Sequence, residues 1–206
     1  MALNRTSVPI SKNDVNNLHK KALRLQKDGN HGEAIKNFDK ALEFEPNNSE
    51  LLYDKAISFQ ILLRFDDAVE YYNKSLKIDP SNFATFINKG LCLSSPNMNR
   101  QEDALFCFDQ ALILVPNDLG ALSLRGYALD SLGRYREAID CFDKVLEAQP
   151  KEINILTNKG LALSHLGKYD EAIAYFDTVL DYEPNNFFVM QLKQEASKSM
   201  KRDFLR

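Results

Sequence analysis

Residues 119–150 read LGALSLRGYALDSLGRYREAIDCFDKVLEAQP and residues 153–184 read INILTNKGLALSHLGKYDEAIAYFDTVLDYEP. Both stretches place a Gly, an Ala, a Phe and a closing Pro at the same four positions. The same layout precedes three earlier prolines, so five repeats end at Pro46, Pro80, Pro116, Pro150 and Pro184. The period is 34 residues with one interval of 36. Repetition at this length is typical of a solenoid, in which each repeat is one supersecondary unit.

Four positions repeat most clearly when the closing Pro is numbered 32. Position 8 is small and position 20 is always Ala, whereas position 11 is large and apolar and position 24 is an aromatic ring. Position 8 holds Ala22, Ala56, Gly90, Gly126 and Gly160, and position 24 holds Phe38, Tyr72, Phe108, Phe142 and Phe176. Small residues at positions 8 and 20 would let two helices approach closely, with the ring filling the gap beside them.

Each repeat is predicted to form two helices, because its apolar residues recur at steps of three and four. Turns such as Leu132-Gly133 end the first helix, since Gly adopts left-handed backbone angles easily. The closing Pro ends the second helix, and the Asn, Asp or Ser after it can cap the next one. The predicted fold class is therefore all-α, a right-handed α-solenoid of helix–turn–helix repeats that are stabilised by stacking.

This layout resembles the tetratricopeptide repeat family, whose pattern is a 34-residue helix–turn–helix with Ala, an aromatic ring and Pro at these positions. The chain departs from that pattern at two positions. The family's Trp position carries milder apolar residues: Leu18, Leu52, Phe86, Leu122 and Leu156. The family's following Leu position is basic throughout: Lys21, Lys55, Lys89, Arg125 and Lys159, with Lys193 after the last repeat.

The predicted domain organisation is one continuous stack between two terminal segments. A flexible tail covers residues 1–12, and the repeats cover residues 15–48, 49–82, 83–118, 119–152 and 153–184. The third repeat carries two extra residues near Pro96, which indicate either a tolerated surface loop or a partner-contacting one. Residues 185–206 are expected to form a capping helix and tail. A dimer interface is the alternative for this helix, because Phe187, Phe188, Met190 and Met200 exceed what a cap needs.

Composition excludes several classes of function. The net charge is −3 and there is no arginine-rich stretch, so we expect no nucleic-acid partner. No window is long and apolar enough for a membrane span or a signal peptide, which favours a cytoplasmic protein. Cys92, Cys107 and Cys141 are expected to be buried thiols and not a disulfide or metal site. With no catalytic motif and only scattered His residues, we expect no enzymatic activity, no cofactor and no metal.

The basic residues that replace the family's Leu stand at position 7 of each repeat, and they have two possible roles. Position 25 in the second helix is acidic or an amide: Asp39, Asn73, Asp109, Asp143 and Asp177. Repeated acids can therefore pair with the repeated bases across helix contacts, and this structural role is the preferred interpretation. The alternative is an exposed row of cations that holds an acidic ligand.

The family resemblance implies a binding surface. In such proteins the first helices of successive repeats line a concave groove that holds a peptide or a helix, through positions 2, 5, 6, 9, 12 and 13. On this sequence the expected partner-binding residues are Leu23, Tyr53, Ile57, Asn88, Leu91, Tyr127, Asn158, Leu161 and His165. The same positions include His19, Glu50, Asp54 and Asp130. Asn88 and Asn158 could each hold a peptide backbone through the amide, or could simply be solvated.

One known use of such a groove is disfavoured by the sequence. Family members that clamp a terminal carboxylate need Lys and Arg at defined groove positions, and no frame of this chain supplies them. The predicted function is a non-catalytic adaptor or scaffold that binds a peptide segment or helix of a partner protein. The alternative is a self-associating structural protein that uses its C-terminal helix and the solenoid ends, which leaves a homo-oligomer open.

Overall fold

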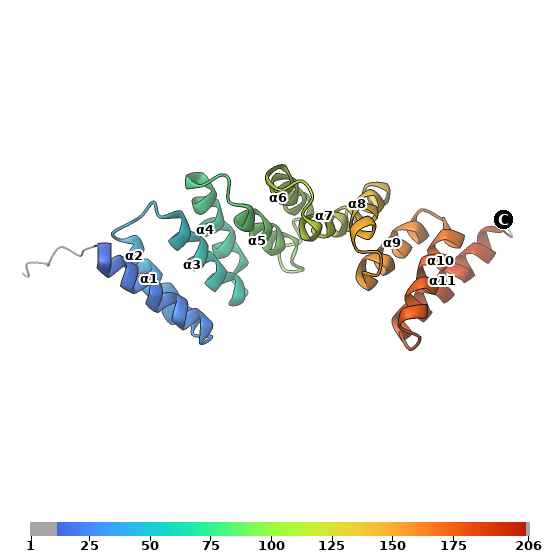
Figure 1. Cartoon of the computed structure of the whole chain (residues 1–206), viewed down its shortest axis with the longest axis horizontal. Helices are drawn as coiled ribbons and strands as arrows, with labels where there is room; N and C mark the ends of the chain where they lie inside the picture. Colours follow the sequence, from blue (N-terminus) through green and yellow to red (C-terminus); the bar gives the residue numbers. More distant parts are fainter. Residues whose placement is uncertain (1–11, 205–206) are drawn as a thin grey trace, which may run out of the picture. The chain divides into compact units, whose positions relative to one another are not determined.

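The computed structural model describes residues 12–204, which form eleven α-helices and no strand (Figure 1). Ten of them are the two helices of each of five repeats, and α11 follows the fifth repeat. Their bounds are α1 Lys12–Lys27, α2 His31–Leu42, α3 Ser49–Ile61, α4 Phe65–Ile78, α5 Phe83–Ser94, α6 Gln101–Leu114, α7 Leu119–Ser131, α8 Tyr135–Ala148, α9 Ile153–His165, α10 Tyr169–Tyr182 and α11 Phe187–Phe204. The predicted all-α fold class is confirmed.

The chain divides into two compact units, residues 1–98 and residues 99–206. Unit 1 contains α1 to α5 and unit 2 contains α6 to α11. The boundary lies in the longer loop of the third repeat, beside Asn99, whose φ is +48°. The prediction that the five repeats form one continuous stack across that loop stays a prediction. The sequence predicted a flexible tail over residues 1–12, but α1 already begins at Lys12. Residues 1–11 of that predicted tail lie outside the described part of the chain.

Close packing of the two helices within a repeat depends on the small residue at position 8. A Cβ atom added to Gly126 would lie 2.5 Å from the ring of Phe142, and one added to Gly160 would lie 2.6 Å from the ring of Phe176. Both rings are fully buried. The predicted pairing of a small residue with a ring therefore holds in the fourth and fifth repeats, and the ring occupies the space that a larger residue would need.

Contacts between repeats use two positions that the sequence patterns did not single out. Positions 3 and 10 of the first helix are buried in every repeat after the first and in α11. Position 3 holds Leu51, Thr85, Ala121, Ile155 and Val189, and position 10 holds Ser58, Cys92, Ala128, Ala162 and Ala196. The first repeat has Asn17 and Arg24 there, both exposed. This difference follows from its place, because no repeat precedes it.

Helix ends follow the predicted turn chemistry. Asn48, Asn82 and Asp118 each accept a hydrogen bond from the backbone N–H three residues later, so they are N-caps. Gly29, Gly133 and Gly167 take φ between +73° and +77° after the first helices. In the second repeat the same place is held by Leu63, with φ +58°.

The three cysteines lie in helices, and all are buried without a disulfide in the described residues. This agrees with their expected role as small core residues. Between residues 12 and 204, no helix is both long enough and apolar enough to cross a membrane.

Candidate functional site

The first helices of the repeats carry the predicted binding residues, and we call their exposed side the first-helix face. In unit 1 this face belongs to α1, α3 and α5, and in unit 2 to α7, α9 and α11. All nine predicted residues keep at least part of their surface exposed, in contrast to positions 3 and 10 of the same helices. Leu23, Tyr53, Ile57, Asn88 and Leu91 lie in unit 1, and Tyr127, Asn158, Leu161 and His165 lie in unit 2. Their role in binding stays a prediction.

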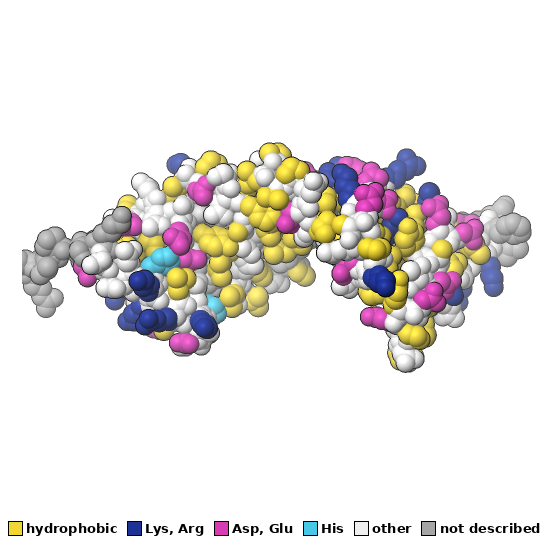
Figure 2. All heavy atoms as spheres, in the orientation of Figure 1, with side chains coloured by type: hydrophobic (Ala, Val, Ile, Leu, Met, Phe, Trp, Pro, Cys, Tyr) yellow, Lys and Arg dark blue, Asp and Glu magenta, His cyan; other side chains and the backbone are white. Residues whose placement is uncertain are grey.

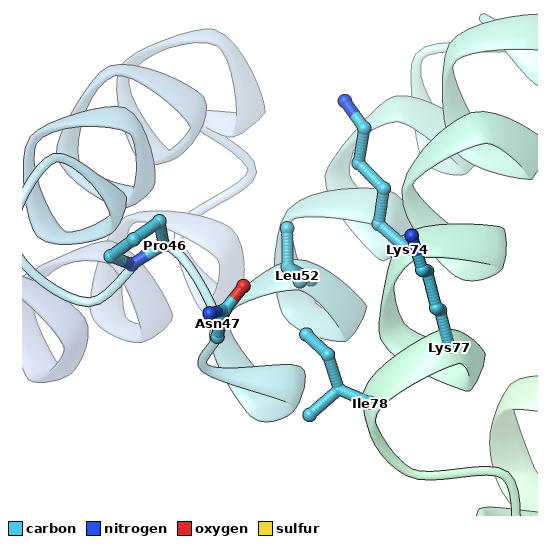
Figure 3. Close-up of a pocket in the computed structure, with 6 residues that line it drawn as sticks. All are labelled: Pro46, Asn47, Leu52, Lys74, Lys77 and Ile78. Atoms are coloured by element: carbon cyan, nitrogen blue, oxygen red, sulfur yellow. The ribbon is translucent and has the colours of Figure 1, made fainter.

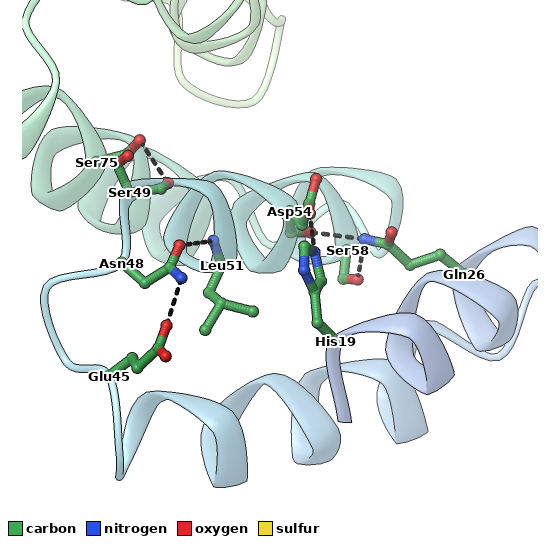
Figure 4. A network of polar contacts seen from close by, with 9 residues as sticks. All are labelled: His19, Gln26, Glu45, Asn48, Ser49, Leu51, Asp54, Ser58 and Ser75. Carbon is green, nitrogen blue, oxygen red and sulfur yellow. Dashed lines mark hydrogen bonds and ion pairs between the residues drawn. The ribbon is translucent and has the colours of Figure 1, made fainter. Parts of the chain in front are cut away.

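An ion pair joins the first two repeats on the face of unit 1. The Nε2 atom of His19 on α1 lies 2.6 Å from Oδ2 of Asp54 on α3 (Figure 4). The hydrogen bond to Asp54 raises the pKa of His19, burial opposes the rise, and the charges of Asp54 and Glu50 add to it. Partial burial of both side chains makes this pair less screened than a surface pair.

A second contact fixes α1 against α3 on the same side. Gln26 lies seven residues after His19, which is two turns of the helix. Its Nε2 atom donates to the backbone oxygen of Asp54 at 2.6 Å and to Oγ of Ser58 at 2.8 Å (Figure 4). The position of Asp54 is therefore set by contacts to both its backbone and its side chain.

Glu50 completes a group of potential metal ligands with this pair. One ligand atom from each of His19, Glu50 and Asp54 lies within 4.8 Å of the others. Glu50 precedes Asp54 by one turn of α3, so both carboxylates lie on the same side of the helix. Figure 2 shows a His side chain beside acidic side chains on the visible face of unit 1.

The two asparagines predicted to face a peptide differ in their contacts. The side-chain amide of Asn88 on α5 donates to the hydroxyl of Tyr53 on α3 at 2.9 Å. Burial raises the pKa of Tyr53, and the bond from Asn88 opposes that rise. Asn158 donates to the backbone oxygen of Asn154 at 2.7 Å, within its own helix and exposed to solvent. The amide of Asn88 therefore bridges two repeats, whereas that of Asn158 does not.

The contacts His19–Asp54 and Tyr53–Asn88 share one register. Each joins position 5 of one repeat to position 6 of the next, 35 residues later. Motif spacing within a single helix could not reveal these pairs, because their members lie in different repeats.

The first-helix face of unit 2 contains one carboxylate oxygen that is buried without a hydrogen-bond partner in the described residues. The Oδ1 atom of Asp130 on α7 is buried and has no hydrogen-bond partner among the described residues. Burial raises the pKa of Asp130, and the nearby His165 lowers it. The ring of His165 packs against that of Tyr135 with centroids 4.6 Å apart. Oδ1 of Asp130 thus has no donor among the described residues even though the ring of His165 lies close by.

Four of the basic residues at position 7 form structural ion pairs. Each pair joins the base to the acid 16 residues earlier, in the second helix of the preceding repeat: Lys55 with Asp39, Arg125 with Asp109, Lys159 with Asp143 and Lys193 with Asp177. Lys55 is almost fully buried, and its ammonium group also lies over the ring of Tyr71 at 3.9 Å. In the described residues Lys89 has no such pair, since Asn73 is uncharged. The preferred structural interpretation is confirmed for these four bases.

Two surface hollows recur at equivalent places in the two units. The first has a volume of about 490 Å³ and is lined by Pro46, Asn47, Leu52, Lys74, Lys77 and Ile78 (Figure 3). The second, of about 570 Å³, is lined by Asn117, Leu119, Leu122, Lys144, Glu147 and Ala148. Their recurrence follows from the repeat, where the loop before a first helix meets the second helix. They contain no predicted binding residue, and a lysine of one is replaced by a glutamate in the other.

Comparison with protein families settles the relationship of the chain. The tetratricopeptide repeat model matches residues 19–83, 97–153 and 123–187. The chain belongs to the tetratricopeptide repeat family. The unmatched residues between 83 and 97 contain most of α5 and the start of the longer loop. A comparison with curated proteins gives no match.

Solved structures share the fold at low sequence identity. The protein MamA has a TM-score of 0.79 and 23% identity, with 84% of this chain and 94% of that chain covered. YrrB, described as a TPR protein with an unusual peptide-binding site, has a TM-score of 0.81 and 22% identity, with 89% of this chain and 94% of that chain covered. A tetratricopeptide repeat protein from Parabacteroides merdae has a TM-score of 0.82 and 21% identity, with 92% of this chain and 74% of that chain covered. At these identities the similarity shows the fold alone.

Proposed function

We propose that this chain is a non-catalytic adaptor that binds a peptide segment or helix of a partner protein in the groove lined by its first helices. Family membership supports protein interaction as the general role. The mixed character of the first-helix face supports a peptide ligand, because apolar Leu23, Ile57 and Leu161 stand beside amides and hydroxyls. YrrB, which shares the fold, is described as having an unusual peptide-binding site, and this gives a precedent for peptide binding by the fold. The cytoplasmic location stays a prediction.

Asp130 is the observation that carries this proposal. A buried acceptor without a donor is unfavourable, and the loss is greater for a charged group. A donor from a ligand would remove that cost, and a lysine or arginine would also supply the missing charge. Tyr127, one turn before Asp130, offers an aromatic surface for the apolar part of the same side chain. We therefore expect partner segments that carry a basic residue next to apolar ones.

Selection of peptides from a displayed random library against the whole chain tests the proposal. The selected peptides should contain Lys or Arg, and Asp130→Asn should weaken their binding about tenfold or more, since a hydrogen bond to a charged group contributes about 1.5–3 kcal/mol. Asp140→Asn is the matched control, because Asp140 is exposed on the second helix of the same repeat. Equal peptide affinity of the wild type and Asp130→Asn would show that Asp130 does not bind the basic residue of the peptide. Failure to select any peptide would remove the groove proposal.

Self-association is the second candidate, and the exposed apolar end of unit 2 favours it. Phe187 and Phe188 at the start of α11 are 79% and 60% exposed. Exposed aromatic clusters often mark interaction surfaces. Light scattering over a concentration series would show a mass that rises with concentration, and Phe187→Ser/Phe188→Ser would abolish the rise. A constant monomer mass would exclude this candidate.

A further inference from the structure

We infer that His19, Glu50 and Asp54 form a binding site for a divalent transition-metal ion, with Zn²⁺ as the ion that fits their chemistry. The three side chains come from two consecutive repeats: His19 from α1, and Glu50 and Asp54 from α3. Their ligand atoms already lie within 4.8 Å of one another. The site is separate from the proposed peptide anchor at Asp130, which lies in unit 2.

The donor set selects the class of metal. One imidazole nitrogen with two carboxylate oxygens suits Zn²⁺, which binds three protein ligands and keeps a fourth position open in sites that exchange ligands. Mg²⁺ and Ca²⁺ prefer oxygen ligands only, so the imidazole disfavours them. Glu50 is exposed, which leaves one side of the group open to solvent for the fourth ligand.

The geometry requires only side-chain movements. Bonds of about 2.1 Å to a tetrahedral Zn²⁺ separate two ligand atoms by about 3.4 Å. His19 Nε2 and Asp54 Oδ2, now 2.6 Å apart, would open slightly to admit the ion. Glu50 is exposed and has rotatable bonds that allow it to close on the ion. The backbone of Asp54 stays fixed by Gln26 during this change.

Charge also favours a cation at this place. Glu50 and Asp54 are one helical turn apart, and like charges at that spacing repel each other. His19 offsets at most one of the two negative charges, and only while it is protonated. A divalent ion would neutralise both carboxylates and would replace the proton that His19 now shares with Asp54. It would thereby tie α1 to α3 more firmly than the present ion pair does.

Few other imidazole or thiol groups in the chain compete for the ion. Its sequence has three histidines and three cysteines, and the cysteines are all buried. His31 is buried as well. His165 is exposed and lies near Asp130 in unit 2, so it provides the matched control for removal of one histidine.

Calorimetric titration of the tag-free, chelator-treated full chain with ZnCl₂ tests this inference. We expect one bound Zn²⁺ per chain, and His19→Gln and Glu50→Gln should each weaken it at least about tenfold, because even loss of an outer-shell partner costs 10- to 100-fold. His165→Gln should leave the affinity unchanged. Glu50 is exposed, so its variant should fold even where His19→Gln weakens the contact between α1 and α3.

Hydrogen exchange supplies a second readout. Zn²⁺ should slow exchange in α1 and α3 of the wild type and leave α7 and α9 unchanged, because bound ligand stabilises only the structure that it holds. The inference would be overturned by the absence of Zn²⁺ binding, or by binding that persists in both His19→Gln and Glu50→Gln. Binding of Ca²⁺ as strong as that of Zn²⁺ would also overturn it, since the imidazole would then have no role.

Discussion

Leu63 occupies a backbone conformation that the other short turns assign to Gly. Its φ of +58° compares with +73° to +77° at Gly29, Gly133 and Gly167. A left-handed residue with a Cβ atom costs about 1–2 kcal/mol. The side chain is 67% exposed and so recovers little by burial.

Replacement of this residue should therefore stabilise the chain. Leu63→Gly removes the strain at φ +58°, and the greater freedom of Gly in the unfolded state takes back about 0.5–1 kcal/mol. We expect a net gain of about 0.5–1 kcal/mol in the free energy of unfolding, measured by urea denaturation. Leu62→Gly, one residue earlier and without a positive φ, should destabilise. Loss of stability in Leu63→Gly would mean that the exposed leucine makes contacts that outweigh its strain.

Asp130 gives a prediction for pH dependence. Burial raises its pKa above the ordinary 3.8, against the opposing effect of His165. The folded state therefore holds this proton more tightly than the unfolded state does. The resulting stability is complete below pH 3.8 and is lost as pH rises through the folded pKa.

The variant Asp130→Asn should be more stable than the wild type at pH 7, because the amide carries no charge beside the buried Oδ1 position that has no donor in the described residues. The gain should shrink as pH falls from 7 towards 3.8, where the wild-type carboxyl also becomes neutral. Urea denaturation of both proteins at several pH values gives the difference directly. A gain that is independent of pH would exclude ionisation of Asp130 as its cause.

At the scale of the helix pair, Gly160 tests the close packing of α9 on α10. Gly160→Ala places a Cβ 2.6 Å from the ring of Phe176, which is fully buried. Overpacking of this kind costs about 1–3 kcal/mol, which exceeds the gain of about 1 kcal/mol from replacing Gly by Ala in a helix. We expect a lower melting temperature for Gly160→Ala.

The control for this substitution is Gly32→Ala in α2. A Cβ at Gly32 meets nothing within 4 Å, so only the helical preference changes and the melting temperature should rise. Ala22 and Ala56 occupy the same repeat position as Gly160. A neutral result at Gly160 would show that the ring of Phe176 can shift as easily as the rings that face those alanines.

Helix α6 differs from its counterparts on its exposed side. Phe106 and Ile113 are 57% and 70% exposed, and Figure 2 shows hydrophobic side chains over the region of α6. In the first, second and fourth repeats the same two positions carry charged residues. Phe106→Lys/Ile113→Glu should leave the free energy of unfolding within about 0.5 kcal/mol of the wild type, because surface substitutions remove little packing. A larger loss in thermal denaturation would show that α6 is covered in solution.

The sequence predicted the helices and turns better than it predicted the side-chain contacts on the first-helix face. The Pro period, the Gly turns and the small residue opposite a ring are local or repeat at a fixed offset, so they can be recognised in one chain. The pairing of position 7 with position 25 was also predictable, since an acid and a base recur in phase. His19–Asp54 was not, because neither residue recurs at its position. The lack of a partner for Oδ1 of Asp130 in the described residues depends on the packing of several side chains, which no periodicity encodes.

For the whole molecule, a solenoid's stability is expected to be a sum over repeats and their neighbouring interfaces. Val189 on α11 is buried in the cluster that contains Leu163, Phe176 and Val179. Val189→Asp would place an unpaired charge there, at a cost of about 3–5 kcal/mol. Its effect should be confined to unit 2, since its contacts lie in α9, α10 and α11.

Hydrogen exchange monitored by mass spectrometry measures this confinement. We expect Val189→Asp to raise exchange in α9, α10 and α11 while α1 to α4 exchange as slowly as in the wild type. Met190→Asp, one residue later and 39% exposed, should change exchange much less, because its charge stays in contact with water. Faster exchange in α1 to α4 would mean that both units unfold in a single cooperative step. The longer loop beside Asn99 would then connect one cooperative stack, whereas confined exchange would make it the boundary between two.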